Sequence, residues 1–138
     1  MINTEKTLEE VNSLNKNTLM EHLAIEYTEI GADYICAKMP VDHRTIQPMG
    51  LLHGGASAAL IESLGSLGSA LSIDLNKQYI VGVEVNANHV RSSKSGYVYG
   101  KGVFKHKGRQ THIWQVDITN EENKLVCTGR LTVLVKNK

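Results

Sequence analysis

A single carboxylate stands out in a long segment that otherwise carries no charge. Glu62 is the only charged residue between His53 and Asp74, within a run rich in Leu, Ala, Gly and Ser. Burying a carboxylate costs on the order of several kcal/mol unless it is paired or neutralised. Glu62 is therefore a candidate general base or nucleophile. The competing interpretation is a structural carboxylate bonded to a backbone group or water, and the chemistry favours the functional role.

The residues before this carboxylate predict a loop that leads directly into a helix. The segment from Gln47 to Gly55 reads Gln-Pro-Met-Gly-Leu-Leu-His-Gly-Gly. A helix N-terminus exposes unpaired N–H groups and a partial positive charge, and glycine lets a ligand approach the backbone closely. Gly54 and Gly55 are thus able to cradle a carbonyl oxygen that becomes negative during a reaction. Taken alone, the glycine pair is better explained as a tight helix entry. The nearby Glu62 favours the functional interpretation instead.

Helix geometry then constrains how these groups can cooperate. Eight residues separate Gly54 from Glu62, which corresponds to about 12 Å of helix rise. One carbonyl cannot contact both groups of the same helix, so a shared substrate requires two subunits with antiparallel helices. Catalysis would therefore require a dimer. Ser66 lies one turn beyond Glu62 on the same face, where it either holds a water molecule or the thioester sulfur, or only packs.

A basic stretch provides the second chemical indication. No acidic residue occurs between Val85 and Val116, while six basic residues do: Arg91, Lys94, Lys101, Lys105, Lys107 and Arg109. His89 and Arg91 are expected to alternate onto one strand face, and residues 107–109 to form a turn with exposed N–H groups. This composition suits a ligand with several phosphates, although a solvated basic face is the usual explanation of a charge run. Nucleic acid fits less well because there is no recognition helix and few aromatic residues.

The overall composition limits the remaining possibilities. The net charge is +1, which argues against a global field for nucleic acid or acidic membranes. The two cysteines, Cys36 and Cys127, lie within strand-like runs, so we expect buried thiols, no disulfide and a cytoplasmic location. The histidines lack metal-ligand spacing, and no nucleotide-binding motif occurs, so we expect neither metal nor cofactor. Residues 51–73 are long enough to span a membrane, but Glu62 at their centre favours a buried helix and no membrane partner.

The pattern along the chain predicts one α+β domain over residues 1–138, with residues 1–18 as a helical N-terminal extension. Thr7 with Glu10, and Thr18 with Glu21, predict two capped helix starts. Strands are expected over residues 24–30, 33–41, 79–90, 97–106, 111–119 and 125–135, and their short connections predict antiparallel neighbours. A long helix is expected over residues 54–72. Gly65 and Gly68 inside this helix predict that a sheet packs very close to its backbone.

Three stretches carry a resemblance to a known family: residues 50–57 (Gly-Leu-Leu-His-Gly-Gly-Ala-Ser), Glu62 with Ser63, and residues 83–91 (Val-Glu-Val-Asn-Ala-Asn-His-Val-Arg). Together they resemble the hotdog-fold thioesterases, in the branch of bacterial 1,4-dihydroxy-2-naphthoyl-CoA and 4-hydroxybenzoyl-CoA thioesterases. The similarity runs from about Leu19 to Leu134. It implies a hotdog fold, with an antiparallel sheet wrapped around one long central helix, and a homotetramer made of two dimers.

The resemblance also implies roles for individual residues. Glu62 would be the catalytic carboxylate, acting as nucleophile or general base, and Gly54 would donate its N–H to the thioester oxygen. Gln47 and His53 would position the acyl and thioester groups, and Ser66 would assist hydrolysis from the subunit that supplies Glu62. The coenzyme A contacts would map onto Gly55, His89, Arg91, Gly108, Arg109 and Gln110.

The expected activity is hydrolysis of an aromatic acyl-CoA, such as 1,4-dihydroxy-2-naphthoyl-CoA, to the free acid and coenzyme A, which here is part of the substrate. Two alternatives stay open. One is a hydratase of enoyl-CoA on the same fold, and the other is a non-catalytic module that binds acyl-CoA or acyl carrier protein. A buried Glu62 without a partner would have little reason to persist in either, which favours the thioesterase.

Overall fold

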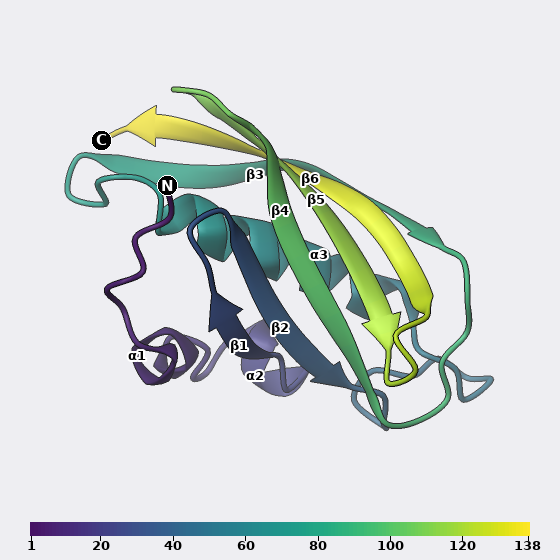
Figure 1. Cartoon of the computed structure of the whole chain (residues 1–138). Coiled ribbons are helices and arrows are strands. Elements are labelled where there is room, and N and C mark those ends of the chain that lie inside the picture. Colours follow the sequence, from purple (N-terminus) through teal and green to yellow (C-terminus); the bar gives the residue numbers. More distant parts are fainter.

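A six-stranded antiparallel sheet curls around one long helix (Figure 1). This computed structural model describes the whole chain, residues 1–138. The strand order is β1-β2-β4-β5-β6-β3, which confirms the predicted hotdog fold. The helices are α1 (Leu8–Ser13), α2 (Leu19–His22) and α3 (Gly54–Ala70); the strands are β1 (Glu26–Ile30), β2 (Tyr34–Pro40), β3 (Gln78–His89), β4 (Tyr97–Lys107), β5 (Thr111–Asn120) and β6 (Leu125–Asn137).

The central helix α3 packs so closely on the sheet that two of its positions leave no room for a side chain. A Cβ atom at Gly68 would lie 2.3 Å from Trp114 Cη2, and one at Gly65 would lie 2.6 Å from Leu131 Cδ2. The Trp114 indole N–H donates to Ser69 Oγ at 2.8 Å across the same contact. The glycines therefore serve the close approach of helix and sheet that the sequence predicted. No helix of the structure combines the length and apolar character needed to cross a bilayer.

The two predicted capped helix starts have different outcomes. At α1 the capping box is present, since Thr7 Oγ1 accepts from the Glu10 N–H and the Glu10 carboxylate accepts from the Thr7 N–H. At α2 the predicted box is wrong. The Thr18 hydroxyl donates to the Asn15 carbonyl at 2.6 Å instead of accepting from the helix. A competing acceptor one turn earlier in the chain has captured the hydroxyl.

Asparagine side chains fasten the N-terminal extension to the edge strand β1. The Asn12 amide donates to the Tyr27 carbonyl at 2.9 Å and accepts from the Tyr27 N–H at 2.8 Å. Nearby, the Asn15 amide donates to the Ile25 carbonyl at 2.9 Å, and Val11 is fully buried. Because α1 occupies backbone groups of β1, this edge of the sheet is covered by the chain itself.

The opposite edge of the sheet, strand β3, has no such cover. β3 is 12 residues long and pairs only with β6. Four large apolar side chains along it are exposed: Tyr79, Val81, Val83 and Val85. A long apolar edge strand offers unpaired N–H and C=O groups to another chain, and folded proteins normally protect such an edge.

Candidate active site

The start of helix α3 holds one backbone donor that the protein leaves free. His53 is the N-cap, and its Nδ1 accepts from the Gly55 N–H at 2.7 Å. The N–H groups of Ala56 and Ser57 donate to the His53 carbonyl at 3.0 and 3.3 Å. Among the first four N–H groups of the helix, only that of Gly54 has no protein acceptor. A free N–H at a helix start is able to donate to a carbonyl oxygen.

The same contacts refine the expected roles of two neighbours. Because Nδ1 of His53 accepts a hydrogen bond, a neutral imidazole carries its proton on Nε2. His53 therefore organises the helix start through its side chain. The Gly55 N–H already donates to His53. A substrate would therefore contact Gly55 through other atoms of its backbone.

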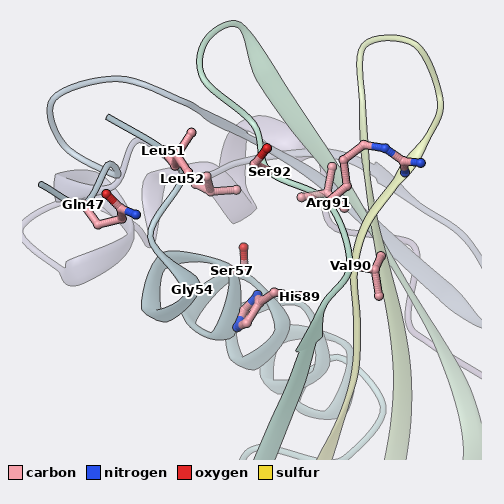
Figure 2. Close-up of a pocket in the computed structure, with 10 residues that line it drawn as sticks. Gln47, Leu51, Leu52, Gly54, Ser57, His89, Val90, Arg91 and Ser92 are labelled. Atoms are coloured by element: carbon pink, nitrogen blue, oxygen red, sulfur yellow. The ribbon is translucent and has the colours of Figure 1, made fainter. Parts of the chain in front are cut away.

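A cavity of about 430 Å³ lies in front of this helix start (Figure 2). The His89 ring closes over Gly54, since a Cβ atom at Gly54 would lie 2.7 Å from His89 Nε2. A larger residue at position 54 would therefore displace the His89 ring from the helix start. The cavity is lined by Gln47, Leu51, Leu52, Gly54, Ser57, His89, Val90, Arg91, Ser92 and Val126.

Gln47 reaches this cavity from a tight loop. Its N–H donates to the Leu51 carbonyl at 2.8 Å, and its own carbonyl accepts from the Gly50 N–H at 2.8 Å. Gly50 has a φ of +76°, a conformation that favours glycine. The side-chain Oε1 of Gln47 accepts from the Met49 N–H. The amide NH₂ group is therefore left to donate into the cavity, on the side that faces Gly54 (Figure 2).

Arg91 lines the cavity, but its charged group points elsewhere. Its guanidinium donates to the Leu125 carbonyl, and Figure 2 shows the side chain directed away from His89. The predicted alternation of His89 and Arg91 onto one strand face is wrong. Strand β3 ends at His89, and the N–H groups of Val90 and Arg91 both donate to the Val126 carbonyl, which breaks the alternation.

Glu62 and Ser66 lie in a different cavity, of about 370 Å³, with mostly apolar walls. The Ser66 hydroxyl donates to Glu62 Oε1 at 3.3 Å. Nearby, the Tyr27 hydroxyl donates to the Ser63 carbonyl at 3.1 Å, and burial raises the pKa of Tyr27, so it stays protonated. The lining consists of Val11, Leu14, Asn15, Met20, Tyr27, Glu62, Ser63, Ser66, Leu67, Ala70 and Ile80. Within one protomer, Gly54 and Glu62 therefore face separate spaces.

The turn at residues 108–110 does not join either cavity within one protomer. Thr111 begins β5 opposite Leu134, whereas Ile118 lies opposite Cys127, the partner of His89 on β6. Seven residues of strand separate these two levels, or about 23 Å. The Gly108 N–H donates to the Thr111 carbonyl at 2.8 Å, so it is not exposed as predicted. The expected coenzyme A contacts thus fall into two groups, at opposite ends of the sheet (Figure 1).

Two residues were missed from the sequence, one lining the Gly54 cavity and one lying against Glu62. Ser57 lies one turn after Gly54 and lines the same cavity, a position that helical spacing alone would have placed on that face. Gly82 lies against the catalytic candidate, because a Cβ atom there would be 2.4 Å from Glu62 Oε1. A glycine inside a strand is a known indication of close approach, but only the structure identifies what approaches.

Comparison with known proteins identifies the family of the chain. Residues 49–127 match the family model of the thioesterase superfamily. The proofreading thioesterase EntH of Cronobacter turicensis is 48% identical over 129 residues, covering 94% of this chain and 93% of that protein. The 1,4-dihydroxy-2-naphthoyl-CoA hydrolase of Escherichia coli is 44% identical over 129 residues, covering 94% of each.

A solved structure extends this similarity to three dimensions. The crystal structure of thioesterase HI1161 from Haemophilus influenzae superposes with a TM-score of 0.94 at 46% sequence identity, over 99% of this chain and 94% of that chain. Sequence and overall fold thus identify the same family. The chain belongs to the thioesterase superfamily and is a hotdog-fold thioesterase.

Proposed function

We propose that this thioesterase hydrolyses an aromatic acyl-CoA to the free acid and coenzyme A, at a site shared between two subunits. The observation that carries the proposal is the arrangement of helix α3. Its start presents the free Gly54 N–H to one cavity, while its middle presents Glu62 to another. The two groups complement each other chemically, and about 12 Å of helix rise keeps them apart within one protomer.

Dimerisation along β3 would bring the two groups together. The open β3 edge carries exposed Tyr79, Val81, Val83 and Val85, so a second copy can extend the sheet there and cover these apolar side chains. An isologous contact would run the two α3 helices antiparallel. In that arrangement the partner subunit's Glu62 approaches the Gly54 cavity, and two equivalent sites form per dimer.

The reaction then follows from these groups. The Gly54 N–H polarises the thioester carbonyl and stabilises the negative oxygen as it forms. Glu62 either attacks the carbonyl carbon directly or removes a proton from an attacking water. The C–S bond breaks, the departing sulfur takes a proton, and one water is consumed overall. Ser66, which donates to Glu62, would orient that carboxylate or the water from the same subunit.

The acyl group would occupy the apolar cavity beside Glu62. Part of its wall comes from Val11 of α1, from Leu14 at the C-cap of α1 and from Met20 of α2, and no cation lines it. Such a lining favours an uncharged, apolar acyl group, and the volume of about 370 Å³ admits an aromatic ring system. One relative is named as a hydrolase of 1,4-dihydroxy-2-naphthoyl-CoA, which makes that thioester our first candidate.

The coenzyme A moiety would extend from the Gly54 cavity past His89 and Arg91. The turn formed by Gly108, Arg109 and Gln110 lies about 23 Å away within one protomer, so its contact with the nucleotide would come from another subunit of the proposed homotetramer. The two cysteines are free, and burial raises the pKa of both thiols. Inert free thiols fit the cytoplasmic location that we propose.

A thiol-release assay across aromatic and aliphatic CoA esters tests this function. We expect the wild-type protein to prefer aromatic esters and Glu62→Gln to lose nearly all activity while keeping its fold. Wild-type turnover by Glu62→Gln would refute the assignment. Hydration of crotonyl-CoA without thiol release would instead indicate a hydratase. Binding of coenzyme A without thiol release from any ester would indicate a non-catalytic module.

A further inference from the structure

Strand β3 has a gap beneath the Glu62 carboxylate, where the chain has glycine. A Cβ atom at Gly82 would lie 2.4 Å from Glu62 Oε1 and 3.3 Å from its Cδ. Side chains do not approach a Cβ atom to 2.4 Å, so any larger residue at position 82 would displace the carboxylate or the strand. The Glu62 carboxylate thus occupies the space that a side chain at position 82 would fill.

Neither backbone conformation nor core packing accounts for this glycine. Gly50 and Gly96 have positive φ angles, whereas the φ angle of Gly82 is not positive. The backbone conformation at position 82 therefore does not require glycine. The glycines at 65 and 68 face Leu131 and Trp114, which belong to the core. Around Gly82, in contrast, all three nearest atoms belong to Glu62.

The strand is also irregular at this point. Gly82 pairs with Val133 and Glu84 pairs with Thr132, so Val83 is an extra residue, and the register shifts there. A bulge of this kind bends a strand and redirects the neighbouring residues, and bulges are frequent beside active sites. The missing side chain and the bulge therefore coincide at the carboxylate. Besides its contact with Gly82, the Glu62 side chain has one hydrogen bond, from Ser66 at 3.3 Å.

We propose that Gly82 is a positioning residue, which holds the Glu62 carboxylate in its reactive place by leaving room for it on β3. The inference rests on the proposed function of Glu62. It adds that the edge strand, and not only helix α3, determines where the carboxylate lies. Filling the gap would shift the carboxylate, and a shift of about 1 Å in a reacting group costs on the order of 10²-fold in rate.

The test compares Gly82→Ala with Gly102→Ala. Both are glycines within strands, but a Cβ atom at Gly102 would meet its nearest neighbours at 3.4 Å or more, which is ordinary contact. We expect Gly82→Ala to lower kcat for an aryl-CoA by about 10- to 100-fold with little change in KM, and Gly102→Ala to keep wild-type kcat. Equal kcat in both variants would overturn the proposal.

Double variants separate positioning from general damage. If Glu62 is what the new methyl group displaces, Gly82→Ala should change the melting temperature less favourably in the wild-type background than in the Glu62→Ala background, where the methyl group meets no carboxylate. The same comparison applies if Gly82→Ala alone fails to fold, because Glu62→Ala should then restore folding. Additive effects on melting temperature would overturn the proposal.

The outcome also distinguishes this inference from the function on which it rests. Loss of activity in Glu62→Gln together with wild-type kcat in Gly82→Ala would refute only the role of Gly82. Wild-type activity in Glu62→Gln would refute the proposed function of Glu62, and the role of Gly82 with it.

Discussion

Mixing two inactive variants tests whether each active site draws on two subunits. Glu62→Ala removes the carboxylate, and Gly54→Val blocks the helix start, because its Cβ atom would lie 2.7 Å from His89 Nε2. Each variant alone should fall to about 1% of wild-type activity or less, since losing a catalytic base typically costs about 10²–10⁴-fold and obstructing an oxyanion donor should cost about as much as losing it, about 10²–10³-fold. The informative measurement is the activity of the mixture.

The size of the recovery follows from two-fold symmetry. In a mixed dimer, one site combines both defects, while the other combines the intact helix start of one subunit with the intact Glu62 of its partner. Random association of equal amounts makes half of the dimers mixed, and each has one working site of two. The mixture should therefore reach about one quarter of wild-type activity per subunit.

The two variants are unfolded together, refolded, and assayed by thiol release from an aryl-CoA. Refolding Glu62→Ala with the double variant Gly54→Val/Glu62→Ala is the matched control, because no mixed dimer of that pair has an intact carboxylate. Recovery near one quarter in the first mixture and none in the control supports the shared site. If sites were contained in one subunit, both mixtures would stay inactive, and the reasoning from helix rise would fail.

Three further predictions concern the contact of α3 with the sheet and a buried histidine. Gly68→Ala forces a methyl group to 2.3 Å from Trp114, so we expect urea denaturation to show a loss of about 1–3 kcal/mol in unfolding free energy. Ser69→Ala leaves the buried Trp114 N–H without its acceptor and should cost about 1–3 kcal/mol in the same assay. His112 is 2% exposed, and burial together with the Lys107 charge lowers its pKa. As pH falls, the imidazole is therefore protonated in the unfolded state before it is protonated in the folded state. The free energy of unfolding should then decrease as pH drops below about 6.5, the ordinary pKa of histidine. His112→Leu should flatten that fall; an unchanged pH profile would contradict this assignment.

Much of the fold was predictable because its signals are local. Alternating apolar residues predicted a strand over 79–90, and β3 is Gln78–His89; the helix predicted over 54–72 is Gly54–Ala70. The predicted bounds and caps are wrong where contacts with other parts of the chain determine them. Strand β6 continues to Asn137 because Asn137 pairs with Gln78, which no local pattern reveals. Thr18 resembles Thr7 in sequence, yet a nearby carbonyl takes its hydroxyl.

For the site, too, local features were predictable from the sequence and contacts between distant elements were not. The start of the helix at Gly54 was predictable from the loop and the glycine pair that lead into it, whereas roles for Gln47 and His53 came only from the family resemblance. The separation of Gly54 from Glu62 followed from helix rise alone. The position of the 108–110 turn depends on the register between β5 and β6, and the importance of Gly82 depends on which helix residue lies over it. Strand register and contacts between a helix and a strand depend on the packing of separate elements, which a single sequence does not show directly.

The contact between Trp114 and α3 also makes the protein convenient to follow by spectroscopy. Trp114 is the only tryptophan of the chain; it is fully buried, and its indole donates to Ser69 on the helix. Its fluorescence therefore reports whether α3 is seated in the sheet. Because Trp114 lines neither of the two cavities of the site, the emission should shift toward the red when the helix detaches and stay nearly constant when a substrate analogue binds.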